Sequence, residues 1–289
     1  MNELKYLTDA ALDDFICTAL KEDVGDGDHS SLASIPAETQ NRAKLIIKDQ
    51  GIIAGLELAR RIFHTVDPEL QVQLSLSDGE DVAHGDIGLY VEGKARSILT
   101  SERLVLNCLQ RMSGIATYTR YLKSLISHTP AQLLDTRKTT PNFRLLEKWA
   151  VAIGGGTNHR FGLYDMIMLK DNHIDYAGGI GKAIAATQDY LKSHHLDLKI
   201  EIETRNLQEV RQVLDVGGIH RIMLDNMSIE DMTAAVQLIG RKYQTEASGG
   251  INENTIAQVA ATGVDFISVG ALTHSVKSLD ISLKADPSK

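Results

Sequence analysis

The sequence has few cysteines, no long apolar run and no excess of basic residues, and each absence excludes a class of protein. The 289 residues include two cysteines, Cys17 and Cys108, which is too few for a disulfide framework. No stretch approaches the roughly 18 consecutive apolar residues of a membrane-spanning helix. The formal net charge of -8 at pH 7 argues against binding of duplex nucleic acid, which favours a net basic face.

Other familiar features are also missing. The first 16 residues are acidic and amphipathic, without the basic start and apolar stretch of a signal peptide. There is no low-complexity tract and no repeat of fixed period. With the low cysteine count, these features predict a cytoplasmic protein that has neither a membrane nor a nucleic acid as partner. At 43% hydrophobic residues the chain can bury a large core, and its length suits one large and one small domain.

The first part of the chain, up to about residue 114, mixes helical and strand patterns. Thr8 or Asp9 can cap a helix over 8–22. A hairpin is expected over 41–56, with its turn at Asp49-Gln50-Gly51. Beyond it, the patterns predict a helix over 55–66, a small β-rich sheet over 72–99, and a long helix over 100–126 that breaks near Gly114.

From about residue 131, short apolar strands alternate with amphipathic helices. Alternating βα units predict a parallel sheet with right-handed crossovers, which makes the fold class α/β. About seven strands that end in polar or small residues favour a closed or nearly closed barrel, and a doubly wound open sheet is the competitor. The expected strands are 131–139, 151–156, 165–171, 198–204, 221–226, 244–250 and 265–270; the expected helices are 143–150, 178–195, 206–215, 228–242 and 252–262.

Charged residues gather where these strands end, which is where a βα barrel carries its active site. On one strand, Glu201 and Glu203 share a face, because alternate residues point to the same side. Buried charges are costly without partners, so this rim is either solvated or built for a charged ligand. One Lys–Asp pair could be structural, but the whole set favours function. The other strand-end residues are Arg137, Lys138, Lys170, Asp225, Ser248, Gly249, Gly250 and Gly270.

These residue types predict a substrate with several negative charges and a phosphorylated sugar. Arginine and lysine bind carboxylates and phosphates, and arginine can do so with two parallel hydrogen bonds. Carboxylates such as Glu203 and Asp225 suit Mg²⁺ or ribose hydroxyls. Glycines such as Gly249 and Gly270 let backbone N–H groups approach a phosphate, particularly where a helix begins after them.

Five segments in a fixed order resemble the quinolinate phosphoribosyltransferase family, also called nicotinate-nucleotide pyrophosphorylase (carboxylating). They are "SER" followed by "LNCLQR", then "DTRKTTP", "GGGTNHRFGLYDMIMLKDNH", "EASGGI" and "DFISVGALTHS". The resemblance runs from the N-terminal helix to about residue 285, so it covers nearly the whole chain. In "TTPNFR", Asn142 stands where a glycine is common in the family; asparagine tolerates a left-handed backbone, so we expect the turn to survive.

The resemblance implies a reaction and an architecture. Phosphoribose passes from phosphoribosyl pyrophosphate to quinolinate, and loss of CO₂ leaves nicotinate mononucleotide on the route to NAD, with Mg²⁺ as cofactor. The implied fold is an α/β sandwich domain over 1–114, to which a tail at about 275–289 can return, and a seven-stranded α/β barrel over 115–274. The implied assembly is a homodimer, or a higher oligomer, in which one subunit's sandwich domain covers the other's barrel mouth.

Matched by position, the resemblance assigns three groups of residues. The residues implied to bind quinolinate are Arg103 from the neighbouring subunit and Arg137, His159, Arg160 and Lys170. The role of Arg103 would account for a charged residue at the start of an apolar helix. The residues implied to bind phosphoribosyl pyrophosphate are Lys138, Lys170, Glu203, Asp225, Ser248, Gly249, Gly250, Gly270 and His274. The implied catalytic residues are Lys138, Lys170, Glu203 and Asp225, and the last two also stand near the metal.

Three questions stay open at this point. Glu201 and Glu203 share a strand face, and the resemblance favours Glu203 for the ribose contact. A paralogue of the same architecture, linked to molybdate-transport operons, would share the phosphoribosyl half of the site and differ at the ring pocket. A barrel that binds a phosphate ligand without turnover, such as a nucleotide sensor, is the non-enzymatic alternative.

Overall fold

The computed structural model describes residues 4–286. The ends of the predicted first domain and C-terminal tail, residues 1–3 and 287–289, lie outside that range. The chain forms two compact units, and the second comprises Tyr121–Lys138 and Gly156–Ala271. The first contains the chain up to Arg120, the segment Thr139–Gly155 and the chain from Leu272 onward. Helix α4 (Ala95–Leu125) carries the chain from one unit into the other, and the predicted division near residue 114 falls inside it.

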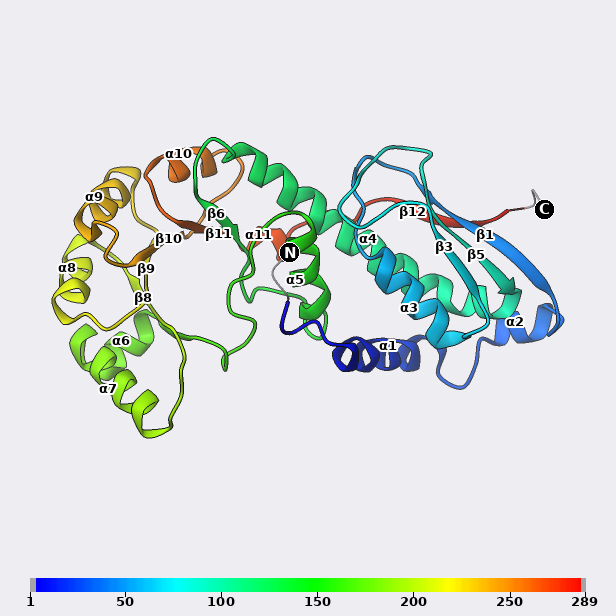
Figure 1. Cartoon of the computed structure of the whole chain (residues 1–289), viewed down its shortest axis with the longest axis horizontal. Helices are drawn as coiled ribbons and strands as arrows, with labels where there is room; N and C mark the ends of the chain where they lie inside the picture. Colours follow the sequence, from blue (N-terminus) through cyan, green and yellow to red (C-terminus); the bar gives the residue numbers. More distant parts are fainter. Residues whose placement is uncertain (1–3, 287–289) are drawn as a thin grey trace. The chain divides into compact units, whose positions relative to one another are not determined.

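The first unit is built on an antiparallel sheet of four strands (Figure 1). Its order is β12 (Ile281–Ala285), β1 (Gln40–Ile47), β5 (Ile87–Lys94) and β3 (Gln71–Leu74). Along β1 buried residues alternate with more exposed ones, and Leu45 and Ile47 are fully buried. Burying one such side chain contributes about 1.5–3 kcal/mol, so this alternation fixes the register of the sheet. Strand β12, from the expected tail, pairs with β1.

The predicted hairpin over 41–56 is wrong as a strand pairing. Strand β1 pairs with β5 and β12, whereas β2 (Gly51–Ile52) pairs with β4 (Asp81–Val82). A turn does form, since the Gln50 N–H donates to the Asp49 carboxylate at 2.9 Å. The apolar residues on both sides of the turn bury against partners distant in sequence, which local patterning cannot show.

Helices complete the first unit. In α1 (Asp9–Val24) the Thr8 hydroxyl caps the helix, accepting from the Ala11 N–H at 3.2 Å as predicted. The short α2 (His29–Ser34) follows, capped by the Asp28 side chain. Helix α3 (Leu56–Val66) buries one apolar face. The predicted break of the long helix near Gly114 is wrong, because α4 is continuous through it. Gly114 instead leaves room for a neighbouring segment: an added Cβ would lie 2.2 Å from the Lys277 carbonyl oxygen.

The second unit contains a six-stranded parallel sheet, in the order β6-β11-β10-β9-β8-β7. From β7 to β11 each strand pairs with the next one in the sequence, and the last strand, β11, pairs with the first, β6. This order is that of a barrel and differs from a doubly wound sheet. An isolated parallel bridge joins Leu134 to Thr157 beyond β6. The strands are β6 (Gln132–Leu134), β7 (Ile167–Leu169), β8 (Ile200–Thr204), β9 (Arg221–Asp225), β10 (Gln244–Ser248) and β11 (Phe266–Ser268).

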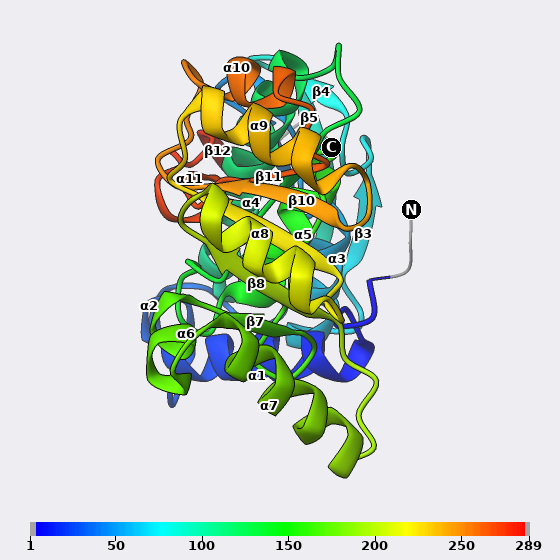
Figure 2. The same ribbon diagram turned by 90° about the vertical axis from the view of Figure 1, so that its left-hand side faces the viewer.

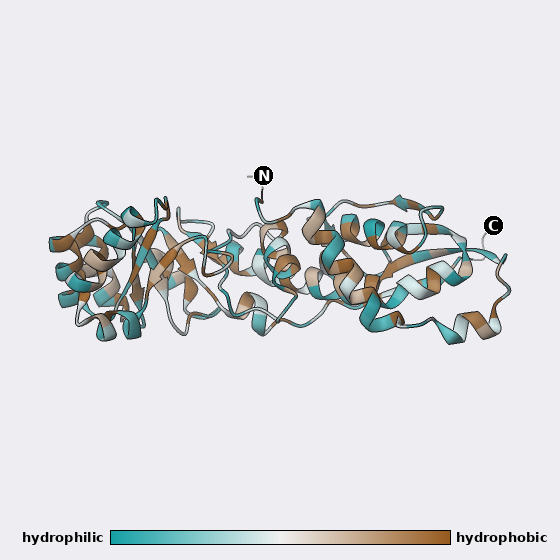
Figure 3. Cartoon of the chain, turned by 90° about the horizontal axis from the view of Figure 1, so that it is seen from below, coloured by the Kyte–Doolittle hydropathy of each residue, from teal (hydrophilic) through white to brown (hydrophobic). Residues whose placement is uncertain are grey.

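Helices cover one face of this parallel sheet, and Figure 2 shows α7, α8 and α9 in front of the strands. Neighbouring helices pack on one another in sequence order, as expected where helices connect successive parallel strands. Strands in Figure 3 are mostly hydrophobic, while the helices alternate between hydrophilic and hydrophobic stretches. The helices are α6 (Asp171–Ala177), α7 (Ile180–Ser193), α8 (Leu207–Val216), α9 (Ile229–Ile239) and α10 (Ile256–Ala261).

The predicted strand over 151–156 does not form: residues 151–153 end a helix, and a turn follows. Val151 belongs to α5 (Arg144–Ile153), whose apolar residues continue the helical period. A short apolar run has no period of its own that distinguishes a strand from the end of a helix. Residue Thr157, just beyond, forms the bridge to Leu134. The turn before α5 survives as expected, with Asn142 at a φ of 61°.

Within residues 4–286, no helix combines the length and the hydropathy that crossing a membrane requires.

We expect the Gly114→Ala variant to unfold at a lower temperature than the wild type. Its Cβ would sit 2.2 Å from the Lys277 carbonyl, and backbone on both sides resists movement. Overpacking of this kind costs about 1–3 kcal/mol. Thermal denaturation checks it, with Ala116→Gly in the same helix as a control for helix propensity. A melting temperature at or above the wild-type value would contradict the close contact.

Candidate active site

Polar side chains lie at the carboxyl ends of neighbouring parallel strands, as the sequence predicts. Lys170 follows β7, and its Nζ atom lies 3.4 Å from Oε2 of Glu203 on β8. The Lys170 side chain is half exposed, while Glu203 is buried. Burial and the nearby carboxylates of Asp225 and Asp171 raise the pKa of Glu203, although Lys170 lowers it. The strand ends therefore bring one lysine and a mutually repelling carboxylate pair together.

The loop after β10 lies against the end of β9. Ser248 pairs with Asp225 in the register, and the Asn226 N–H donates to the Ser248 carbonyl at 2.9 Å. Gly249 has a φ of 101°, and an added Cβ would lie 2.1 Å from the Asn226 side-chain oxygen. Only glycine satisfies both conditions, so backbone approaches closely here.

The expected helix start directly after these glycines is not observed. Helix α10 begins at Ile256, several residues beyond Gly250. After Gly270, α11 (Ala271–His274) begins at once but has only four residues. Backbone N–H groups of the loops, rather than a long helix dipole, are therefore what these segments offer to an anion.

Two arginines form the cationic side of the site. Burial lowers the pKa of Arg160, and the positive charge of Arg137 lowers it further. The Arg160 guanidinium donates to the Met166 carbonyl at 3.1 Å. The Asp165 carboxylate accepts from the N–H groups of Phe161 and Gly162, at 2.6 and 2.9 Å, and closes the loop that follows Arg160. Two adjacent like charges favour an anion between them.

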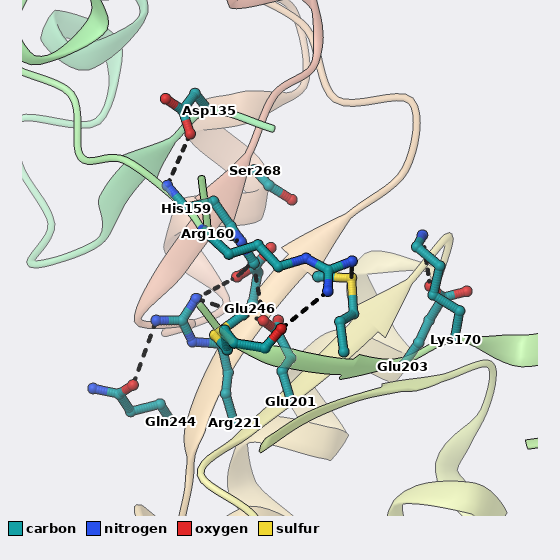
Figure 4. Close-up of polar contacts among 12 residues, drawn as sticks. Asp135, His159, Arg160, Lys170, Glu201, Glu203, Arg221, Gln244, Glu246 and Ser268 are labelled. Carbon is teal, nitrogen blue, oxygen red and sulfur yellow. Dashed lines mark hydrogen bonds and ion pairs between the residues drawn. The ribbon is translucent and has the colours of Figure 1, made fainter. Parts of the chain in front are cut away.

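His159 is anchored from the strand side by Asp135. The His159 N–H donates to Oδ1 of Asp135 at 2.8 Å, and the Asn158 side-chain amide donates to Oδ2 at 2.6 Å. Asp135 follows β6 directly and is fully buried. One carboxylate thus ties the loop carrying His159 to the strand end that leads to Arg137 (Figure 4).

The ring of His159 is engaged at both nitrogens. Its Nε2 lies 3.0 Å from Oε2 of Glu201 and 3.4 Å from Oε2 of Glu246. Its Nδ1 accepts from the Arg160 backbone N–H at 2.7 Å. The residue is only 9% exposed. A direct bond from His159 to a substrate would therefore require one of these protein contacts to break.

The two sides of the ring make opposite demands on its protons. Burial opposes a charged ring, but Glu201 and Glu246 outweigh it and raise the pKa of His159 to about 9. The Arg160 amide, which can only donate, requires an unprotonated Nδ1. While the 2.7 Å amide contact is present, the ring carries one proton, on Nε2. A second proton would have to displace the Arg160 amide.

Arg221 and Glu246 complete a buried cluster and are not among the predicted site residues. Arg221 Nη1 lies 2.7 Å from Oε2 of Glu246 and 3.9 Å from Oε2 of Glu201, and its guanidinium stacks 4.0 Å from the Phe266 ring centroid. Burial opposes ionisation of Glu246, yet His159 and Arg221 hold its pKa below the ordinary value. Burial and Glu246 raise the pKa of Glu201. Alternation along β9 and β10 is the signal that could have identified both residues.

This cluster also contains three potential metal ligands. In the described part of the chain, the ligand atoms of His159, Glu201 and Glu246 all lie within 4.8 Å of one another. The Arg221 guanidinium already stands 2.7 Å from the Glu246 carboxylate and supplies the compensating positive charge. A divalent cation would have to share this space with a guanidinium, so the donor set fits an ion cluster better than a metal centre.

Family models account for nearly the whole chain. The model described as "Quinolinate phosphoribosyl transferase, C-terminal domain" matches residues 115–284. The corresponding N-terminal domain model matches residues 28–113. The chain belongs to the quinolinate phosphoribosyl transferase family. The two matches meet at residue 114, inside α4.

Individual relatives agree with the family assignment. A quinolinate phosphoribosyltransferase [decarboxylating] from Nicotiana glauca is 48% identical over 93% of this chain and 80% of its own length. A probable nicotinate-nucleotide pyrophosphorylase [carboxylating] from Bacillus subtilis is 42% identical, over 91% and 89%. The crystal structure of NadC from Streptococcus pyogenes has a TM-score of 0.90 at 41% identity, covering 96% of this chain and 97% of that one. A nicotinate-nucleotide pyrophosphorylase from Francisella tularensis has a TM-score of 0.91 at 37% identity, covering 99% and 100%.

Three further residues are singled out by the family resemblance. Lys138 is exposed, and its N–H donates to the Thr136 hydroxyl at 3.0 Å. Arg103 belongs to the first unit and is exposed to solvent. It lies well inside the sequence of α4, which starts at Ala95, so the expectation that it begins this helix is wrong. His274 also belongs to the first unit, where its Nδ1 lies 2.6 Å from the Ser275 hydroxyl.

Proposed function

We propose that this protein transfers the phosphoribosyl group of phosphoribosyl pyrophosphate to the ring nitrogen of quinolinate. The ring then loses its 2-carboxylate as CO₂, and the products are nicotinate mononucleotide and pyrophosphate, in NAD biosynthesis. The observation that carries this assignment is the Lys170–Glu203 pair at the ends of β7 and β8, 3.4 Å apart, in a chain of this family. The loops that follow β6 and precede β7 add Arg137 and Arg160. Two guanidinium groups and a lysine suit the two carboxylates of quinolinate.

In the quinolinate pocket, Arg137, Arg160 and Lys170 bind the carboxylates and hold the ring. Arg160 and Arg137 repel each other in the free protein, and a bound dianion relieves that repulsion. The Met166 and Met168 contacts restrain the Arg160 guanidinium, so little side-chain freedom is lost on binding. His159 serves the pocket by holding the Arg160 backbone amide.

The phosphoribosyl half of the site lies at the other strand ends. Glu203, rather than Glu201, contacts the ribose, because Glu201 is enclosed beside His159. Asp225 stands next to Ser248, Gly249 and Gly250, whose close backbone approach exposes amide donors to phosphate. The remaining proposed phosphate ligands are Lys138, Lys170, Gly270 and His274.

Glu203 and Asp225 fit a role near Mg²⁺. Asp225 raises the pKa of Glu203, so a cation close to both carboxylates would relieve their repulsion. Mg²⁺ is typically bound through one or two carboxylates together with substrate phosphates and water. When bound, the ion supplies positive charge that stabilises the departing pyrophosphate.

The residues of the chain orient the quinolinate ring and neutralise the charge of the leaving pyrophosphate. The quinolinate pocket directs the ring nitrogen at C1 of the ribose. This removes much of the entropic cost of bringing the two reacting atoms together. Lys138 and Lys170 neutralise negative charge that develops on the leaving pyrophosphate. Once ribosylated, the ring nitrogen is cationic and stabilises the carbanion that remains when CO₂ departs. None of these steps needs a covalent bond to the protein.

We further place the enzyme in the cytoplasm, as a homodimer in which Arg103 reaches the quinolinate of the neighbouring subunit. Support for the location is the lack of a disulfide framework in a chain with two cysteines. Support for the shared site is the exposure of Arg103 on α4, since an exposed arginine is free to meet a ligand held elsewhere.

Incubation with quinolinate, phosphoribosyl pyrophosphate and Mg²⁺ should release CO₂ and nicotinate mononucleotide in equal amounts. Nicotinate should be a poor substrate, because it leaves the positive charge of the pocket unpaired. Radiolabelled CO₂ release and chromatography of the nucleotide check both points. Efficient use of nicotinate would contradict decarboxylation; turnover of a different ring, or binding of phosphoribosyl pyrophosphate without turnover, would favour the paralogue or the sensor.

Mixed dimers test the shared site. We expect Arg103→Ala and Arg137→Ala each to lower activity severely when assayed alone. After proven subunit exchange, their mixture should regain activity, because a mixed dimer contains one complete site. An Arg103→Lys control checks how much of the loss comes from the guanidinium group rather than the charge. No recovery in exchanged dimers would show that Arg103 acts in its own subunit or not at all.

A further inference from the structure

Beneath the rim, the parallel sheet of the second unit encloses four charged or titratable side chains that no step of the reaction uses. His159, Glu201 and Glu246 have side chains at most 5% exposed, and Arg221 is 15% exposed. Glu201, Arg221 and Glu246 come from the adjacent strands β8, β9 and β10. Because they are so enclosed, their charges can be compensated only by one another, although neither carboxylate oxygen of Glu201 makes a hydrogen bond among the described residues.

The strand register explains why they meet. Arg221 is paired with Glu201 on one side and with Gln244 on the other, and Glu246 is paired with Phe266. Alternation then puts Glu201, Arg221 and Glu246 on one face of three neighbouring strands. Arg221 stacks on Phe266 and reaches across to Glu246. Rigid strands therefore fix the positions of both carboxylates.

The carboxylates of Glu201 and Glu246 in turn fix the ring of His159, and this ring fixes the backbone of Arg160. Glu201 and Glu246 hold Nε2, and the Arg160 backbone N–H donates to Nδ1. Asp135 holds the backbone of His159 from the opposite direction. A chain of short polar contacts thus runs from the strand interior to the backbone of an arginine in the carboxylate pocket (Figure 4).

We propose that Glu201, Glu246 and Arg221 are positioning residues, which act through His159 to set the place of Arg160 in the quinolinate pocket. This inference rests on the proposed function, and it assigns His159 a supporting part rather than a bond to substrate. The charged groups that contact the ring are Glu201 and Glu246, from the strands, and the Arg160 backbone contacts it from the loop. Arg221 faces the two carboxylates, and Asp135 binds the His159 backbone.

The Glu201→Gln and Glu246→Gln variants test this, because each keeps the side-chain shape and removes one charge. We expect the KM for quinolinate to rise on the order of ten- to hundredfold, as displaced binding groups do. The KM for phosphoribosyl pyrophosphate should stay within about twofold, since Lys170, Glu203 and the glycine loops are untouched. Glu230→Gln is the matched control, an exposed glutamate on α9 of the same unit, and should match the wild type on both substrates.

A second readout does not depend on turnover. The carboxylates raise the pKa of His159, so its value, followed by NMR of the ring, should fall in both variants and stay unchanged in Glu230→Gln. The Arg160 amide resonance should move in the same two variants. If a single variant fails to fold, the Glu246→Gln/Arg221→Gln pair removes one charge of each sign and should show the same selective rise in the KM for quinolinate.

The outcomes separate this proposal from the proposed function. A wild-type protein that forms no nicotinate mononucleotide overturns the function, while the His159 and Arg160 resonances still test the linkage. Unchanged resonances, or equal increases in both KM values, overturn the positioning role. One equivalent of Zn²⁺ bound by the wild type and lost in Glu201→Gln would make the cluster a metal centre and overturn the proposal too.

Discussion

The buried ion cluster of His159, Glu201, Arg221 and Glu246 constrains everything above it in the second unit. Its charges are largely removed from water, and removing one partner of such a buried set typically costs about 3–5 kcal/mol. The strands therefore cannot shift in register without exposing or unpairing a charge. A sheet core built this way is costly compared with an apolar one, which is reason to look for a use. Its upper edge supplies one, because the His159 ring ends against the backbone of a pocket arginine.

The two layers of the site divide the work. Below, charges of opposite sign are paired, enclosed and held by strands. Above, the positive charge of Arg137 adds to burial in lowering the pKa of Arg160, and Glu203 and Asp225 form a repelling pair beside Lys170. A site with unrelieved repulsion of both signs suits the two proposed substrates, one of which carries two carboxylates and the other a pyrophosphate. In our proposal, the lower layer holds Arg160, one member of the upper layer, in place through His159.

Much of this was predictable from sequence, because the period of two along strands places side chains. The rim residues Lys170, Glu203 and Asp225 follow directly from strand-end positions, and five motifs identify the family. The predictions failed where a local pattern was ambiguous: the apolar run at Val151 continues a helix, and β1 finds partners far along the chain. Arg221 and Glu246 were missed because their importance lies in pairing across three strands, and the register is a property of the fold. The motif that contains His159 also does not reveal that both of its ring nitrogens are engaged in contacts within the protein.

The most direct test is a crystal structure of the protein with quinolinate bound. The account predicts that the carboxylate oxygens lie within hydrogen-bond distance of Arg137, Arg160 and Lys170. In the same structure, Nε2 of His159 should remain with Glu201 and Glu246, and Nδ1 should remain with the Arg160 amide. A quinolinate oxygen bonded to either ring nitrogen of His159, with the contacts to Glu201 or Arg160 broken, would contradict it.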